Sequence, residues 1–130
     1  MLVGGYAVIL RGYSRSTGDM DIWVNKTSAN FEKLQKAITE FGLPIAAVPR
    51  QQFFSEAFDV FSFGRPPYAI EILTALKGIS NFEEAFNLAT IETVDQVEVR
   101  VIHLKHLIKA KEAAGRYKDK NDLENLPQMD

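Results

Sequence analysis

Two carboxylates in the segment Asp19-Met20-Asp21 are the side chains of this chain best suited to chemistry. They are two residues apart, so in a β-strand both would leave the same face. Like charges placed side by side repel each other unless a positive group lies between them. Divalent cations prefer hard oxygen ligands such as carboxylates, so the pair predicts a metal site. A solvated strand edge is the alternative interpretation.

A glycine pair, Gly4-Gly5, stands between a short apolar strand at 2–3 and a short amphipathic helix expected over 6–11. Glycine lets a backbone turn tightly or approach a ligand closely. The first turn of the helix would aim free backbone N–H groups outward, which is an arrangement that binds anions. Without the nearby acids, an ordinary tight turn would be the better interpretation.

A third acid, Glu71, lies inside the apolar run 69–73, which is typical of a strand. A carboxylate buried in such a strand requires a partner, because burying it alone is costly. Two partners are open at this point. One is a metal shared with Asp19 and Asp21, and the other is a base such as Arg65.

Lys111 lies on the apolar stripe that Leu104, Leu107 and Ile108 form in an expected C-terminal helix. A lysine there either extends along apolar surface to reach water or serves as a ligand. Gly115 should end this helix, and a last helix is expected to run through Leu126.

The segment after Gly115 contains four charged residues close together: Arg116, Lys118, Asp119 and Asp122. These charges fit either a structural ion-pair cluster or a set of phosphate and substrate contacts.

Turn residues and periodicity predict the scaffold around these groups. His103 and His106 stand at a helix start without a ligand set, so capping or surface positions are expected for them. The Phe-rich segment 53–63 is expected in the core. Two further helices are expected, one between the caps at 27–30 and Gly42 and one at 82–88, with a turn at 49–52. Strands are expected at 20–25, 60–63 and 68–73, and 64–67 should link the last two. The segments 90–94 and 97–102 should form a hairpin.

Composition narrows the class of protein. The chain has 130 residues, 46% of them apolar, which fits a single domain with a sizeable core. The net charge of −2 gives no global attraction to nucleic acid, and the absence of cysteine excludes disulfides and thiolate metal sites. We expect one α/β (α+β) domain over 1–130, with a mixed sheet of about five strands and flanking helices mainly on one side.

Together, these features resemble the polymerase-β-type nucleotidyltransferase superfamily. The chain is most similar to small bacterial nucleotidyltransferase-like proteins related to abortive-infection toxins. These read V-G-G-x-A-V and H-G-x-x-R-x-T-x-D-x-D-I near the start, and L-I-x-x-K-x-x-A-G-R-x-K-D-x-x-D-L in the last helices. The matching residues here are Val3, Gly4, Gly5, Ala7, Val8, Gly12, Arg15, Thr17, Asp19, Asp21, Ile22, Leu107, Ile108, Lys111, Ala114, Gly115, Arg116, Lys118, Asp119, Asp122 and Leu123.

The resemblance implies a polymerase-β-like fold that transfers a nucleoside monophosphate from a nucleoside triphosphate to a hydroxyl. It implies that Asp19, Asp21 and Glu71 are catalytic and hold Mg²⁺ (or Mn²⁺). The nucleotide-binding positions implied by it are Gly4, Gly5, Arg15, Thr17, Lys111, Arg116 and Lys118.

The acceptor stays open between an RNA end, a protein and a small aminoglycoside-like molecule. An antitoxin partner and a homodimer are both compatible with the resemblance. No apolar run approaches the ~20 residues of a membrane span, so a cytoplasmic protein without a membrane partner is expected.

The chain departs from the family pattern at two places. Leu10-Arg11 replaces the histidine that often precedes Gly12, and the chain opens in its first strand where relatives begin with a helix, so we expect that helix to be lacking. A non-catalytic binding module, for example half of a toxin–antitoxin pair, is therefore the second hypothesis. A metal-dependent phosphohydrolase, which would release inorganic phosphate instead of pyrophosphate, is the third.

Overall fold

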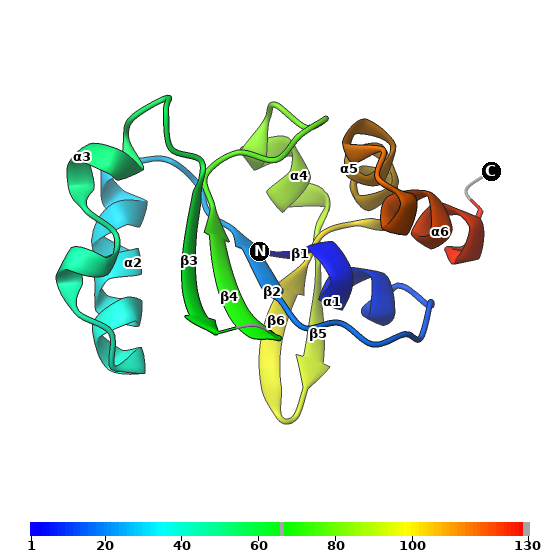
Figure 1. Cartoon of the computed structure of the whole chain (residues 1–130), viewed down its shortest axis with the longest axis horizontal. Coiled ribbons are helices and arrows are strands. Elements are labelled where there is room, and N and C mark those ends of the chain that lie inside the picture. The colour runs from blue at the N-terminus through cyan, green and yellow to red at the C-terminus, as the bar shows by residue number, and fades with distance from the viewer. Residues whose placement is uncertain (66, 129–130) are drawn as a thin grey trace.

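A six-stranded mixed sheet forms the centre of the protein (Figure 1). The computed structural model describes residues 1–65 and 67–128. The strands are β1 (Leu2–Val3), β2 (Met20–Trp23), β3 (Val60–Arg65), β4 (Tyr68–Leu73), β5 (Thr90–Val94) and β6 (Val97–Val101). Their order across the sheet is β3-β4-β2-β1-β6-β5. The sheet thus has one strand more than the five or so expected. Pro66, in the expected link at 64–67, lies outside the described residues, and Gly64 and Arg65 extend β3.

The helices connect these strands and follow them. They are α1 (Gly4–Leu10), α2 (Ser28–Phe41), α3 (Arg50–Phe53), α4 (Phe82–Leu88), α5 (Leu104–Ala114) and α6 (Tyr117–Asn125), with a 3₁₀ turn, η1 (Ile45–Ala47). In the part of the chain that the structure describes, no helix is long and apolar enough to cross a membrane.

Local signals explain several of these boundaries. The Thr27 side chain caps α2 by accepting from the Asn30 backbone N–H at 3.2 Å, and Gly42 ends α2 in the left-handed conformation at φ 103°. The hairpin β5–β6 turns at Asp95 and Gln96, both with positive φ, as a tight two-residue hairpin turn requires. The expected turn at 49–52 is instead the start of the short helix α3.

Two apolar clusters lie on opposite faces of the sheet. On one face, Trp23 packs edge-on against Phe82 of α4 at 4.9 Å between ring centroids, in a cluster that includes residues of α1 and α5. On the other face, Phe31 of α2 and Phe53 of α3 pack with Ile72. Helices thus cover both faces, with α1, α4 and α5 on the first and α2 and α3 on the second (Figure 1), whereas helices mainly on one side were expected. The Phe-rich segment is core at Phe53 and Phe61, as expected, but Phe58 is 43% exposed.

The two histidines differ from each other. His103 caps α5, as predicted, with its Nδ1 accepting from the Lys105 N–H at 3.0 Å. His106 is buried with 3% exposure, not at the surface, and its Nδ1 has no hydrogen-bond partner among the described residues. Burial lowers the pKa of His106, against the opposing effect of Glu84, and the charges around it are those of Glu84, Lys105, Lys109 and His103.

His106 should make the protein lose stability in mild acid. Because the pKa of His106 is lower in the folded protein than in the unfolded chain, the unfolded chain binds more protons at this residue below about pH 6.5, and the contribution of His106 to the unfolding free energy should drop as pH falls from 7.5 to 5.5. Urea unfolding of the wild type and of His106→Phe at both pH values measures this contribution as a difference, because the raised pKa of Asp21, which acts in the opposite direction over this range, is common to both proteins. The unfolding free energy of His106→Phe should fall less, or rise more, than that of the wild type. An equal change in the two proteins would contradict this.

Candidate functional site

One cleft of about 730 Å³ contains all ten side chains and glycines that the sequence singled out. It lies between the sheet strands β1, β2 and β4 and the C-terminal helices, and the loop before β2 closes its side. The predicted residues that line it are Gly4, Gly5, Arg15, Thr17, Asp19, Asp21, Glu71, Lys111, Arg116 and Lys118. Residues far apart in the chain are thus brought together as expected.

The pairing of the strands fixes the positions of the acids relative to one another. β2 runs antiparallel to β1 and parallel to β4, which places Val3, Asp21 and Glu71 in one row across three strands. Asp21 and Glu71 are direct neighbours, and Asp19 precedes Asp21 at the entry to β2. Of the two partners considered for Glu71, the structure places it beside an acid and not beside Arg65, which lies at the far end of β3.

The electrostatics of this pair are unfavourable for two carboxylates. Burial raises the pKa of Asp21 to about 7, a hydrogen bond with Glu71 and the charges of Glu71 and Asp19 add to the rise, and Lys118 opposes it. Two carboxyl groups hydrogen-bond to each other only when they share a proton. Among the described residues, 1–65 and 67–128, no three acidic or histidine side chains lie close enough together to form a metal-ligand set. Asp21 and Glu71 thus lie side by side in one cleft, and their proximity favours the protonated form of Asp21.

The glycine pair is needed because two side chains occupy the space that a Cβ would fill. At Gly4, with φ 66°, a Cβ would overlap the Asp21 carboxylate, and at Gly5 it would overlap the Thr17 hydroxyl. Both glycines lie in the first turn of α1 and not in a separate turn before it. Their lack of side chains lets the Asp21 carboxylate and the loop before β2 approach the backbone.

Gly4→Ala should therefore destabilise the protein more than a positive φ alone does. A positive φ costs an alanine about 1–2 kcal/mol, and the overlap with Asp21 adds to it. Gly42→Ala is the matched control, because Gly42 has φ 103° with nothing within 4 Å of its Cβ position. Urea unfolding of both variants compares the two losses, and an equal loss would show that the approach of Asp21 imposes no constraint.

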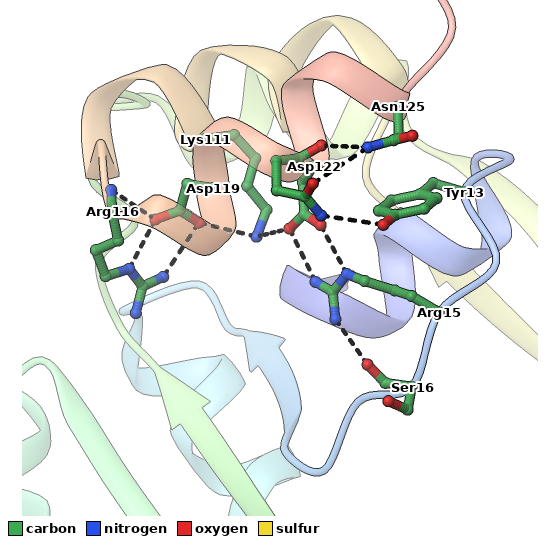
Figure 2. A network of polar contacts seen from close by, with 9 residues as sticks. Tyr13, Arg15, Ser16, Lys111, Arg116, Asp119, Asp122 and Asn125 are labelled. Carbon is green, nitrogen blue, oxygen red and sulfur yellow. Dashed lines mark hydrogen bonds and ion pairs between the residues drawn. The ribbon is translucent and has the colours of Figure 1, made fainter.

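Lys111 belongs to a buried ion-pair cluster. It is 6% exposed, and its Nζ lies 3.0 Å from Asp119 Oδ1 and 2.9 Å from Asp122 Oδ2 (Figure 2). Both aspartates are fully buried. The interpretation in which the Lys111 side chain extends to water is therefore wrong. Its ammonium group is instead paired with two aspartates of the same chain.

Two arginines complete the cluster from opposite ends (Figure 2). Arg15 donates two hydrogen bonds to Asp122, from Nε to Oδ1 at 2.6 Å and from Nη2 to Oδ2 at 2.8 Å. Arg116 binds Asp119 through its side chain at 2.7 and 3.3 Å and through its backbone N–H at 3.1 Å. We call Arg15, Lys111, Arg116, Asp119 and Asp122 the charge cluster. The cluster interpretation of the C-terminal charges is thus correct for Arg116, Asp119 and Asp122.

Lys118 is different from these three cations. It is exposed, lines the cleft, and acts electrostatically on Asp21. Among the described residues, no ion pair involves it. Lys118 is therefore available to an anion bound near the acids.

The cleft has further lining residues that the sequence did not single out, among them Asp59 and Lys77. Asp59 lies just before β3, and its carbonyl accepts from the Thr74 N–H at 3.0 Å, which brings it to the far end of β4. No motif surrounds either residue. Asp59 lies in the cleft because β3 pairs antiparallel with β4. Its position there could have been predicted from the strand register but not from the residue type.

Arg11, which precedes Gly12, has a structural role. Its guanidinium donates to the carbonyls of Val101 and Ile102 at 3.0 and 2.9 Å, and it pairs with Glu92 at 3.2 Å. The end of α1 is thereby fixed to the β5–β6 hairpin.

The charge cluster should make the protein sensitive to strong acid. Burial works to raise the pKa of Asp119, but hydrogen bonds from Arg116 and Lys111 outweigh it and lower the pKa from 3.8 to about 2. The stability that Asp119 contributes is therefore present above about pH 4 and lost as pH falls towards 2.

Asp119→Asn should lower the unfolding free energy at pH 7 by about 3–5 kcal/mol, because it leaves Lys111 and Arg116 short of a counter-charge. It should also flatten the loss between pH 4 and 2, as followed by urea unfolding. Asp95→Asn at the exposed hairpin turn is the control for the same chemical change. If both variants follow the acid profile of the wild type, Asp119 does not carry this dependence.

Comparisons of the sequence with protein-family models and with curated proteins found no match in either set.

Proposed function

We propose that this chain is a metal-dependent nucleotidyltransferase with a polymerase-β-like fold. The observation that carries the proposal is the row formed by Asp21 and Glu71 on adjacent parallel strands, with Asp19 at the entry to β2 and the glycine pair against Asp21. The order along the chain is a short strand, a glycine pair, one acid that leads into a strand with a second acid, and a neighbouring strand with a third acid, which is the order that the family resemblance implies.

The acids fit a divalent metal. The raised pKa of Asp21 comes from burial and from neighbouring carboxylates, so a cation between them would remove the repulsion that a proton on Asp21 otherwise relieves. Asp19, Asp21 and Glu71 would hold Mg²⁺ or Mn²⁺. When bound, the ion neutralises phosphate charge and favours the attacking and leaving oxygens of an in-line displacement.

The protein's own groups supply the rest of the proposed reaction. Glu71 accepts the proton of an acceptor hydroxyl, the hydroxyl oxygen forms a bond to the α-phosphorus, and the bond to the β-phosphate oxygen breaks to release pyrophosphate. Lys118 and the outer face of Arg116 balance charge on the leaving phosphates. Thr17, Gly4 and Gly5 form the part of the cleft wall beside these phosphates.

The charges of the chain bear on the proposed acceptor and setting. Three cations in the cleft wall are already paired with aspartates, and the net charge is −2. A long nucleic-acid footprint would need many unpaired cations, so a short RNA end, a protein side chain or a small hydroxyl compound fits better. The proposed setting is a bacterial cytoplasm, in keeping with a chain that lacks cysteine.

The same pairing favours one second candidate. Because Arg15, Lys111 and Arg116 are engaged by Asp119 and Asp122, fewer donors are left for a triphosphate than the sequence motif indicates. A non-catalytic module that keeps the fold and binds a partner, such as an antitoxin or a second copy of the chain, accounts for this as well.

Labelled nucleoside triphosphates incubated with the protein, a cell extract and Mg²⁺ or Mn²⁺ test the enzyme proposal. Label should enter one acceptor with release of pyrophosphate, and Asp21→Asn or Glu71→Gln should reduce this by roughly 100-fold or more, because each removes a metal ligand or base. The matched controls are Asp95→Asn and Glu40→Gln, the same changes at exposed positions.

Three results would contradict the nucleotidyltransferase proposal. Full activity in both cleft variants would show that the acids are not catalytic. Calorimetry that finds no binding of any nucleoside triphosphate with Mg²⁺ would favour the binding module, and release of inorganic phosphate without transfer would favour a phosphohydrolase.

A further inference from the structure

The loop of residues 13–19 carries three candidate site residues but forms neither helix nor strand. Arg15, Thr17 and Asp19 lie on it, and Asp19 leads directly into β2. An irregular segment has no regular backbone ladder to fix it, so its position depends on individual contacts. What holds this loop therefore decides where Asp19 lies relative to Asp21.

Two side-chain contacts attach the loop to α6. Asn121 donates to the Tyr13 hydroxyl at 3.0 Å, and Arg15 binds both oxygens of Asp122 (Figure 2). A two-point arginine–carboxylate pair fixes orientation as well as distance. Arg15 also donates to the Ser16 carbonyl at 2.9 Å, so the same guanidinium fixes the loop backbone.

Asp122 cannot move away from this position without breaking a second contact. Its side chain is 1% exposed, and its other partner is Lys111, which is itself held by Asp119. Burial works to raise the pKa of Asp122, but hydrogen bonds from Arg15 and Lys111 outweigh it and keep the pKa below its usual range. Asp122 is a fixed, charged anchor on α6, behind the cleft wall to which Lys111 and Asp119 belong.

The loop is closely packed on both sides of Thr17. The Arg15 guanidinium lies close to the position that a Cβ on Gly5 would occupy, and the Thr17 hydroxyl fills the same space. At Gly18 a side chain would overlap the Pro67 carbonyl, so the loop is also closely packed where it enters β2. A loss of the Arg15–Asp122 pair would release the loop on the side of α1.

We infer that Asp122 is a positioning residue for the metal site: through Arg15 it sets the loop that carries Asp19 into place beside Asp21. Asp21 and Glu71 are held by the sheet, whereas Asp19 is held through α6. The inference rests on the proposed function, because it needs a metal that these acids bind.

Mn²⁺ binding without nucleotide, measured by calorimetry on variants whose circular dichroism shows them folded, tests the inference. Asp122→Asn keeps the size of the side chain but removes the charge and one acceptor. Mn²⁺ affinity should fall about tenfold or more, as is typical when a residue that orients a metal ligand is replaced.

Asp119→Asn is the matched control, because Asp119 is equally buried and shares Lys111 but pairs with Arg116 and not with the loop. It should leave Mn²⁺ affinity within about twofold of the wild type. If both aspartates affected stability only, the two variants would bind Mn²⁺ alike, and that result would overturn the inference.

Arg15→Lys serves where Asp122→Asn does not fold, since it keeps the charge and loses only the two-point grip. It should weaken Mn²⁺ binding in the same direction, with Arg11→Lys as its control, because the Arg11 guanidinium also makes several hydrogen bonds but to the backbone at Val101 and Ile102 and not to Asp122. Unchanged affinity in Arg15→Lys would count against the inference.

Amide hydrogen exchange separates this inference from the proposed function. A wild-type protein that binds no Mn²⁺ contradicts the proposed metal site. Positioning by Asp122 is then decided by exchange of residues 13–19: faster exchange in Asp122→Asn than in Asp119→Asn supports it, and equal exchange overturns it.

Discussion

Repulsion between Asp21 and Glu71 is the constraint on which the rest of the site depends. The two residues are neighbours in the pairing of β2 with β4, so the backbone ladder itself holds their carboxylates together. Separating them would require a shift in strand register, which would move Ile22 and Ile72 out of the apolar cluster beneath α2. The packing of the core therefore maintains an electrostatically unfavourable pair, and the pair must be relieved by a proton or a cation.

The surroundings of the pair divide the charges between two layers. The acids lie on the sheet, and the cations lie on the helical wall of the cleft. Within the charge cluster, Arg15, Lys111 and Arg116 outnumber Asp119 and Asp122 by one positive charge. Because these cations are held by buried aspartates, they cannot swing across to neutralise Asp21 and Glu71. The wall keeps its positive character without collapsing onto the acids, which leaves the cleft open.

Local signals predicted most of the elements, because each has its own caps and periodicity. Thr27 and Gly42 bound α2, and Asp95 and Gln96 turn the hairpin, without help from the rest of the fold. The four-residue helix α3 is shorter than a helical repeat pattern can reveal, so Pro49 indicated only a turn. Which face each helix covers depends on how the connections cross the sheet, and the periodicity of a single helix carries no such information.

The acids and glycines of the site could be predicted because their spacing within short segments is tied to a turn and a strand. The state of Lys111 could not, since its stripe on α5 fits both an extended side chain and a paired one. Its partners lie on α6, and only the reversal at Gly115, in the left-handed conformation at φ 64°, folds them back onto it. Burial of His106 likewise depends on how α5 packs in the fold, which its own position at a helix start does not reveal.

A buried charge cluster is a poor means of stabilising a fold. Removing charges from water is costly, and apolar residues of similar volume often stabilise as well or better. Two aspartates with no exposure and a lysine with 6% exposure thus require a reason other than stability. The cluster lies where α5 and α6 line the cleft, and it reaches the loop before β2 through Arg15. Apolar side chains in its place could pack the two helices, but they could neither grip that loop in a fixed orientation nor present positive charge to the acids. The fold has its most costly interactions where they act on the cleft, as a site that must hold charged ligands in a fixed geometry would require.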